Sequence, residues 1–176
     1  DTIKGMVFMF DLSVSGNSVA QTTAATLNVG NGYSTGGTVT NATTFAKIGI
    51  NLTTTNGTFA LRDVTNGTNS ANFSGTQTIT WVMNTYTSGF TYLAPDNSTE
   101  SIAANTWDLW VGTAKVFDDK TPQTSTIDNL TDFKFLYTAG AADITFDNFV
   151  VEGSDGNLPV ELTSFSATTI GSTVKL

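Results

Sequence analysis

The segment FAKIGINLTTTNGTFALRDV, residues 45–64, contains two short apolar stretches separated by a polar pentapeptide. Residues 45–52 and 58–64 are rich in β-branched, aromatic and aliphatic residues, as strands are. Between them lies TTTNG, in which Asn56-Gly57 is a strong signal for a tight turn because both residues tolerate positive φ. The segment therefore predicts an antiparallel β-hairpin.

The same pattern extends in both directions along the chain. In IKGMVFMFDLSV, residues 3–14, one face carries Met6, Phe8, Phe10 and Leu12, which is the alternation expected of a strand on a core. No stretch carries a helical apolar period over several turns. Ten to twelve strands at spacings of about 8–12 residues predict an all-β fold with two antiparallel sheets packed as a sandwich. An up-and-down barrel is less favoured because the loops are long and uneven. The remaining expected strands cover residues 24–29, 76–84, 90–95, 106–111, 113–119, 131–138 and 142–153.

The chain of 176 residues divides at Gly153. We expect a β-sandwich domain over residues 1–153. Residues 154–157, SDGN, are a linker, and LPVELTSFSATTIGSTVKL follows as an extended segment. Pro159 cannot donate a ladder hydrogen bond, which suits an edge strand or the first strand of a new module.

Composition excludes several classes of function. The formal net charge is −8, from 15 acidic and 7 basic residues, so nucleic acid and anionic membrane surfaces are poor partners. No run of about 18 apolar residues predicts membrane insertion. There is no histidine and no cysteine, which rules out imidazole acid–base chemistry, thiolate nucleophiles and zinc–sulfur sites. No pair of carboxylates is selected by spacing for glycoside hydrolysis, and we expect no enzyme activity.

Two stretches carry a family resemblance. LPVELTSFSA, residues 158–167, resembles segments found near the C-termini of Bacteroidetes proteins exported by the type IX secretion system. WDLWVGTAKVFDD (107–119) and ITFDNFVVEG (144–153) resemble strands of laminin-G or concanavalin-like jelly-roll domains. The resemblance implies a jelly-roll sandwich in a secreted protein, located outside the cell or at its surface, that binds glycans or other surfaces.

Four residues are candidates for binding such a ligand. Sugar-binding modules stack exposed aromatic rings on sugar faces. Trp81 and Trp107 alternate in phase with aliphatic residues and are expected in the core. Trp110 lies on the opposite face with Asp108, where it could form a stacking platform or pack beneath a loop or second layer. Tyr33, in the glycine-rich loop of residues 31–37, and Tyr92, beside a turn, are further candidates.

Three carboxylates are candidates for calcium, an ion that jelly-roll modules often hold through hard oxygen ligands. Asp118 is expected at a turn. Asp147 shares a predicted strand face with Thr145 and Phe149, and Asp11 lies in the first strand; a carboxylate on such a face needs a cation, a base or amide donors as its partner. Turn acids exposed to solvent are the alternative interpretation.

These observations predict a secreted, non-catalytic binding module for a polysaccharide or cell-surface glycan. The alternative is a structural subunit of an extracellular filament, in which residues 160–176 complete the sheet of a neighbouring copy by β-strand addition. A hydrolase or lyase domain is a third hypothesis, because similar sandwiches also host enzymes.

Overall fold

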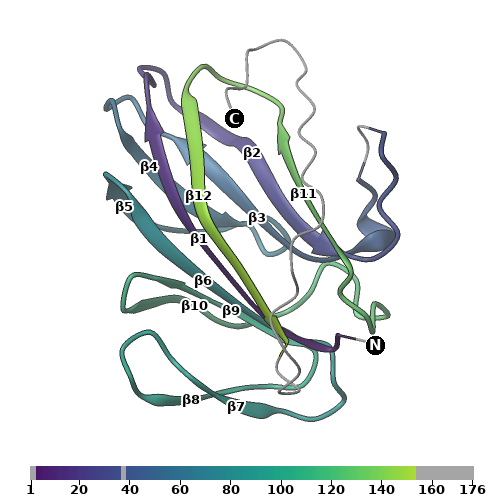
Figure 1. The fold of residues 1–176 in the computed structure, drawn as a ribbon. Helices are drawn as coiled ribbons and strands as arrows, with labels where there is room; N and C mark the ends of the chain where they lie inside the picture. The colour runs from purple at the N-terminus through teal and green to yellow at the C-terminus, as the bar shows by residue number, and fades with distance from the viewer. Residues whose placement is uncertain (1–2, 37–38, 154–176) are drawn as a thin grey trace.

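The computed structural model describes residues 3–36 and 39–153 and shows an all-β sandwich of two five-stranded antiparallel sheets. One sheet has the order β10-β9-β6-β1-β12 and the other β11-β2-β3-β4-β5; β7 and β8 form a separate hairpin (Figure 1). The predicted two-sheet antiparallel fold is confirmed, and it is consistent with a jelly-roll-like arrangement. The strands are β1 Gly5–Ser15, β2 Gln21–Gly30, β3 Thr44–Leu52, β4 Thr58–Asp63, β5 Thr68–Ser74, β6 Gln77–Asn84, β7 Phe90–Leu93, β8 Thr99–Ile102, β9 Thr106–Val111, β10 Ala114–Lys120, β11 Asp132–Tyr137 and β12 Asp143–Gly153, with one 3-10 turn, η1, at Asn41–Thr43.

Strand alternation builds the core between the two sheets. Met6, Phe8, Phe10 and Leu12 of β1 are buried, as predicted, whereas the intervening residues of the strand are partly exposed. Trp81 and Trp107 are both fully buried in this core, with ring centroids 5.9 Å apart in an edge-to-face arrangement. Such large aromatic side chains bury more apolar area per residue than the aliphatic ones around them, and so stabilise the sandwich.

The β3–β4 hairpin at residues 45–64 forms in the predicted place. Its loop, residues 53–57, ends at Gly57 with φ +75°. Asn17, from the loop after β1, is buried beside it: its Nδ2 donates to the carbonyl oxygens of Thr53, Thr55 and Thr58, and its Oδ1 accepts from Gly57 N at 2.8 Å. This distant amide therefore pairs the Thr53 carbonyl and the Gly57 N–H, and it adds a further donor to the Thr55 and Thr58 carbonyls, which already accept bonds within the turn.

The β7–β8 hairpin covers the outer face of β9, on the side away from the core. In β7, Phe90 and Tyr92 are partly buried, whereas Thr91 and Leu93 are exposed. Ala94, Ile102 and Trp110 are buried but do not belong to the inter-sheet core. β9 is thus covered on both faces, which is why five of its six residues are buried.

Several local expectations were wrong. Thr68–Ser74 form β5 and Thr99–Ile102 form β8, two strands that are not among those expected from the sequence. Asp118 lies within β10 and not at a turn. A bulge at Asp147-Asn148, with Asn148 at φ 54°, shifts the phase of β12, so that Asp147 is exposed and does not share the face of Phe149.

No helix among the described residues is long and apolar enough to cross a membrane. The predicted linker and extended segment, residues 154–176, lie outside the described residues, as does the type IX-like motif within them.

Candidate functional site

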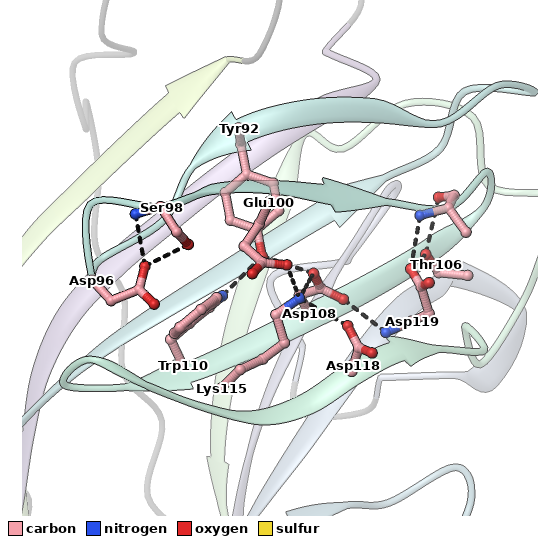
Figure 2. A network of polar contacts seen from close by, with 11 residues as sticks. Tyr92, Asp96, Ser98, Glu100, Thr106, Asp108, Trp110, Lys115, Asp118 and Asp119 are labelled. Carbon is pink, nitrogen blue, oxygen red and sulfur yellow. Dashed lines mark hydrogen bonds and ion pairs between the residues drawn. The ribbon is translucent and has the colours of Figure 1, made fainter.

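Four of the seven predicted site residues come together where the β7–β8 hairpin meets β9 and β10. They are Tyr92 on β7, Asp108 and Trp110 on β9, and Asp118 on β10. Figure 2 shows these side chains converging with Glu100 of β8 and Lys115 of β10. We call these six residues the hairpin network.

Asp108 is the buried centre of the hairpin network and is 0% exposed. Its Oδ2 accepts a hydrogen bond from the Tyr92 hydroxyl at 2.7 Å, and its Oδ1 accepts one from the Asp119 backbone N–H at 2.7 Å. Burial raises the pKa of Asp108, and these donors partly offset that effect. The carboxylate is buried with partners, as a buried charge must be.

Lys115 is the cation of the hairpin network. Its Nζ lies 2.8 Å from Glu100 Oε2, 2.8 Å from Asp118 Oδ1 and 3.3 Å from Asp108 Oδ2, and 5.3 Å from the centroid of the Trp110 ring. Burial lowers the pKa of Lys115, but hydrogen bonds to Asp118 and Glu100 and the charge of Asp108 outweigh burial and raise it overall. Lys115 therefore stays charged and ties three acidic side chains together.

Trp110 is 2% exposed, because the β7–β8 hairpin lies over it. Its Nε1 donates to the Tyr92 hydroxyl at 2.8 Å. The expectation of an open stacking face at Trp110 is therefore wrong, and the alternative, that this side chain packs beneath a second layer, is confirmed. Tyr92 itself is partly buried, and burial together with its bond to Asp108 raises its pKa, which keeps the hydroxyl a donor.

The turns around the hairpin network are fixed by two further carboxylates. Asp119, at φ 45°, accepts from Ala103 N at 2.7 Å and from Thr106 Oγ1 at 3.1 Å, which joins β10 to the β8–β9 turn. Asp96 accepts from the backbone N–H and the hydroxyl of Ser98, which closes the β7–β8 turn (Figure 2). These bonds hold the hairpin at a fixed position over β9.

Tyr33 lies elsewhere, over the ends of β2 and β3. Its hydroxyl bonds Thr44 Oγ1 at 3.2 Å, and its backbone N–H donates to Asp132 Oδ2 at 2.9 Å. The side chain is partly buried, and burial raises its pKa. Tyr33 thus tethers its loop to the sheet and does not join the hairpin network.

Asp11 and Asp147 face each other across the β1–β12 pairing, whereas Asp118 is on β10 at the other edge of the same sheet. Asp11 accepts from Thr78 Oγ1 and Asn148 Nδ2, both at 2.7 Å, and Asp147 accepts from Asn148 N at 2.8 Å. Within residues 3–36 and 39–153, no three or more His, Cys, Asp or Glu side chains form a group that could hold a metal ion. Calcium binding at these residues stays a prediction.

Sequence reasoning missed Glu100, Lys115 and Asp119. Glu100 gave no signal because its four-residue strand carries little apolar pattern. Lys115 had a usable signal: the turn at Gly112, with φ +56°, sets a register in which Lys115 pairs with Trp110. Asp119 gave no usable signal, because its position beside Asp108 depends on an irregular register in β10.

No family model matches this chain, and neither the curated proteins nor the solved structures contain a match to it. The class that the fold itself defines is an antiparallel β-sandwich with a hairpin packed on one outer face.

The hairpin network is built to hold groups in place. Every carboxylate in it already has a donor or cation partner, and its aromatic ring systems are fixed by hydrogen bonds. Asp118 remains 67% exposed and Glu100 34% exposed, so both can accept further hydrogen bonds from a ligand at the surface. This arrangement suits binding, because oriented carboxylate acceptors complement sugar hydroxyls and the partly exposed ring of Tyr92 complements a sugar C–H face.

Proposed function

We propose that this chain is a non-catalytic binding module for glycans on a secreted, cell-surface protein. The observation that carries the proposal is a pair of carboxylates, the half-buried Glu100 and the exposed Asp118, each held 2.8 Å from the Lys115 ammonium. Glu100 also pairs with Tyr92 across the β7–β8 hairpin. Pre-oriented acceptors lose little conformational entropy when a ligand binds. The low charged fraction, 12%, and the 34 threonines also suit an extracellular surface of hydroxyls and amides.

A non-catalytic role is favoured over hydrolysis by the pairing within the hairpin network. Glycosidases need one carboxyl group free to act as an acid and another free to act as a base or nucleophile on opposite sides of a bond. Here Glu100 and Asp118 share one ammonium, and Asp108 lies beneath Tyr92.

The test is a screen of the intact chain against a glycan array, followed by titration of the strongest neutral glycan. Glu100→Gln and Asp118→Asn should each weaken that binding about tenfold, as expected for one lost charged hydrogen bond. Asp143→Asn is the matched control, since Asp143 is an exposed carboxylate on β12. A blank array, or equal losses in all three variants, would contradict the proposal.

The filament alternative has one structural observation in its favour. Among the described strands, β12 is an edge strand of 11 residues that pairs only with β1. Edges of this length can accept another strand, although the bulge at Asp147-Asn148 and the exposed acids Asp143 and Glu152 are features that discourage it. Sedimentation of the intact chain over a wide concentration range tests assembly. Oligomers that Leu162→Asp abolishes would support strand addition, and a monomer at all concentrations would oppose it.

A further inference from the structure

The two sheets carry opposite charge. The strands of the β10-β9-β6-β1-β12 sheet contain seven acidic residues and two basic ones. The strands of the β11-β2-β3-β4-β5 sheet contain three basic residues, Lys47, Arg62 and Lys134, and two acidic ones, Asp63 and Asp132. Asp63 is 0% exposed and bonds to Asn66. The acidic residues of the strands are thus concentrated in one sheet, and the other sheet carries a small excess of basic residues.

All three basic residues project from the outer face of their sheet. In each of these strands the neighbouring apolar residues pack toward the core, so the residues that alternate with them face outward. The apolar neighbours are Phe133 and Phe135 in β11, Leu27 in β2, Ile48 in β3, and Phe59 and Leu61 in β4. Lys134 pairs with Asn28, and Asn28 pairs with Lys47, which puts the two lysines on either side of β2 in one row across the sheet. Their backbones are two strand spacings apart, about 10 Å. Arg62, on the next strand β4, pairs with Gly49, which lies two residues after Lys47 in β3 and on the same face.

None of the three cations has a carboxylate partner among the described residues, since the ion pairs found there all involve Lys115. Lys134 Nζ donates to the carbonyl oxygens of Ser34 and Gly36, and Arg62 NH1 donates to Asn69 Oδ1 at 2.9 Å. Both contacts orient the side chain and leave its positive charge uncompensated. Lys47 makes no side-chain hydrogen bond in the described part of the chain.

Side-chain amides lie next to these cations. Asn51 Nδ2 donates to Asn69 Oδ1 at 3.1 Å, beside Arg62. Asn28, between the two lysines, is buried and its Oδ1 has no hydrogen-bond partner. Asn28 therefore supports the face from beneath and does not reach a ligand, whereas the exposed amide of Asn69 lies beside Arg62. Spaced cations with such an exposed amide complement a ligand that carries both carboxylates and hydroxyls.

We propose that the outer face of the β11-β2-β3-β4-β5 sheet binds an acidic polysaccharide, one whose sugar units carry carboxylates, through Lys47, Arg62 and Lys134. This inference rests on the proposed glycan-binding function and adds a second contact face with a defined ligand charge. The net charge of −8 opposes every polyanion, and it opposes nucleic acid most strongly because a duplex carries one charge per about 1.7 Å of axis. A polyuronate has fewer charges per length and many hydroxyls for the amides.

The experiment measures binding of the intact chain to polygalacturonate, with dextran as the uncharged polymer. Lys47→Gln and Arg62→Gln should each weaken polygalacturonate binding about tenfold. Lys120→Gln, which removes the same charge from β10 of the acidic sheet, should leave it unchanged. Binding should also weaken as salt rises, because the contacts are between exposed charges.

Three outcomes would overturn the inference: equal loss in the Lys120→Gln control, equal affinity for dextran, or tighter binding to duplex DNA than to polygalacturonate. Sedimentation without glycan provides a further check. If Lys47→Gln disperses an oligomer of the chain, the acidic sheet of a second copy occupies this face and the inference is wrong. The proposed neutral-glycan site is judged separately, since its variants, Glu100→Gln and Asp118→Asn, lie in and beside the other sheet.

Discussion

The hydroxyl of Tyr92 donates to the buried carboxylate of Asp108 at 2.7 Å, across the gap between the β7–β8 hairpin and the outer face of β9. The same hydroxyl oxygen accepts from Trp110 Nε1 at 2.8 Å. One oxygen therefore satisfies two polar groups that the hairpin buries, and it fixes the hairpin to the sandwich.

Tyr92→Phe should lower the free energy of unfolding by about 1–3 kcal/mol, because the buried Trp110 N–H loses its partner and Asp108 Oδ2 keeps only Lys115. Urea denaturation measures the change. Tyr86→Phe is the matched control, since the Tyr86 hydroxyl makes no hydrogen bond in the described part of the chain. Equal losses in the two variants would show that the Tyr92 bonds do not stabilise the fold.

Lys115→Met should destabilise the protein by about 3 kcal/mol, since it leaves Asp108 buried next to two other carboxylates without a cation. This loss of unfolding free energy is at the low end for a buried ion pair because the Lys115 side chain is 17% exposed. Adding Asp108→Asn should recover part of the loss, which a double-mutant cycle by chemical denaturation would measure. Lys120→Met is the control. An additive double mutant would mean that Lys115 and Asp108 are not coupled.

The sequence predicted the sandwich because its strands alternate strongly. Trp81, Trp107 and the β1 residues each show a period of two, and their burial follows from that period alone. It left two alternatives open at Trp110, because β9 is covered twice and the second cover is a hairpin whose strands, of four residues each, have almost no apolar pattern. It failed at Asp147 because one extra residue in a bulge reverses the face of every side chain beyond it.

The candidate site was also predictable in part from the alternation of side chains along strands. Asp108 and Trp110 were selected on a partly polar strand face and Tyr92 beside a turn, and the structure brings the three together. The ammonium that lies among them belongs to Lys115 on β10. Its position follows from the register of β10 against β9, in which Lys115 pairs with Trp110. The difference in charge between the two sheets could not be predicted without the strand order, because that order joins β11 to β2 across about 100 residues of chain.

Asp11 should make stability depend on pH. Hydrogen bonds from Thr78 and Asn148 lower the pKa of Asp11 below its ordinary value of 3.8. A carboxyl group whose pKa is lower in the folded state stabilises that state above its unfolded pKa, and the contribution is lost as pH falls through the folded pKa. The stability difference between wild type and Asp11→Asn should therefore be constant from pH 7 to about pH 5 and shrink below about pH 4.

Urea denaturation at a series of pH values measures this difference. Asp143→Asn serves as control, because Asp143 is an exposed residue of β12 for which no side-chain hydrogen bond is found in the described residues. A wild-type to Asp11→Asn difference that stays constant down to pH 2 would show that the bonds to Thr78 and Asn148 do not favour the ionised form.

Gly30→Ala should destabilise the protein severely, because β2 ends there in close contact with the strand that enters β3. A Cβ atom on Gly30 would lie 2.0 Å from the Thr43 carbonyl oxygen and 2.9 Å from the Tyr33 hydroxyl. The Thr43 oxygen also accepts from Asn31 N at 3.0 Å, so it cannot move without loss of that bond. We expect a loss of at least about 3 kcal/mol in unfolding free energy, measured by urea denaturation. Gly36→Ala in the same loop is the control, since its Cβ would come no closer than 3.5 Å to any atom, and should cost less than about 1 kcal/mol. Similar stabilities for the two variants would mean that the β2 end and the η1 turn are not packed as closely as the structure shows.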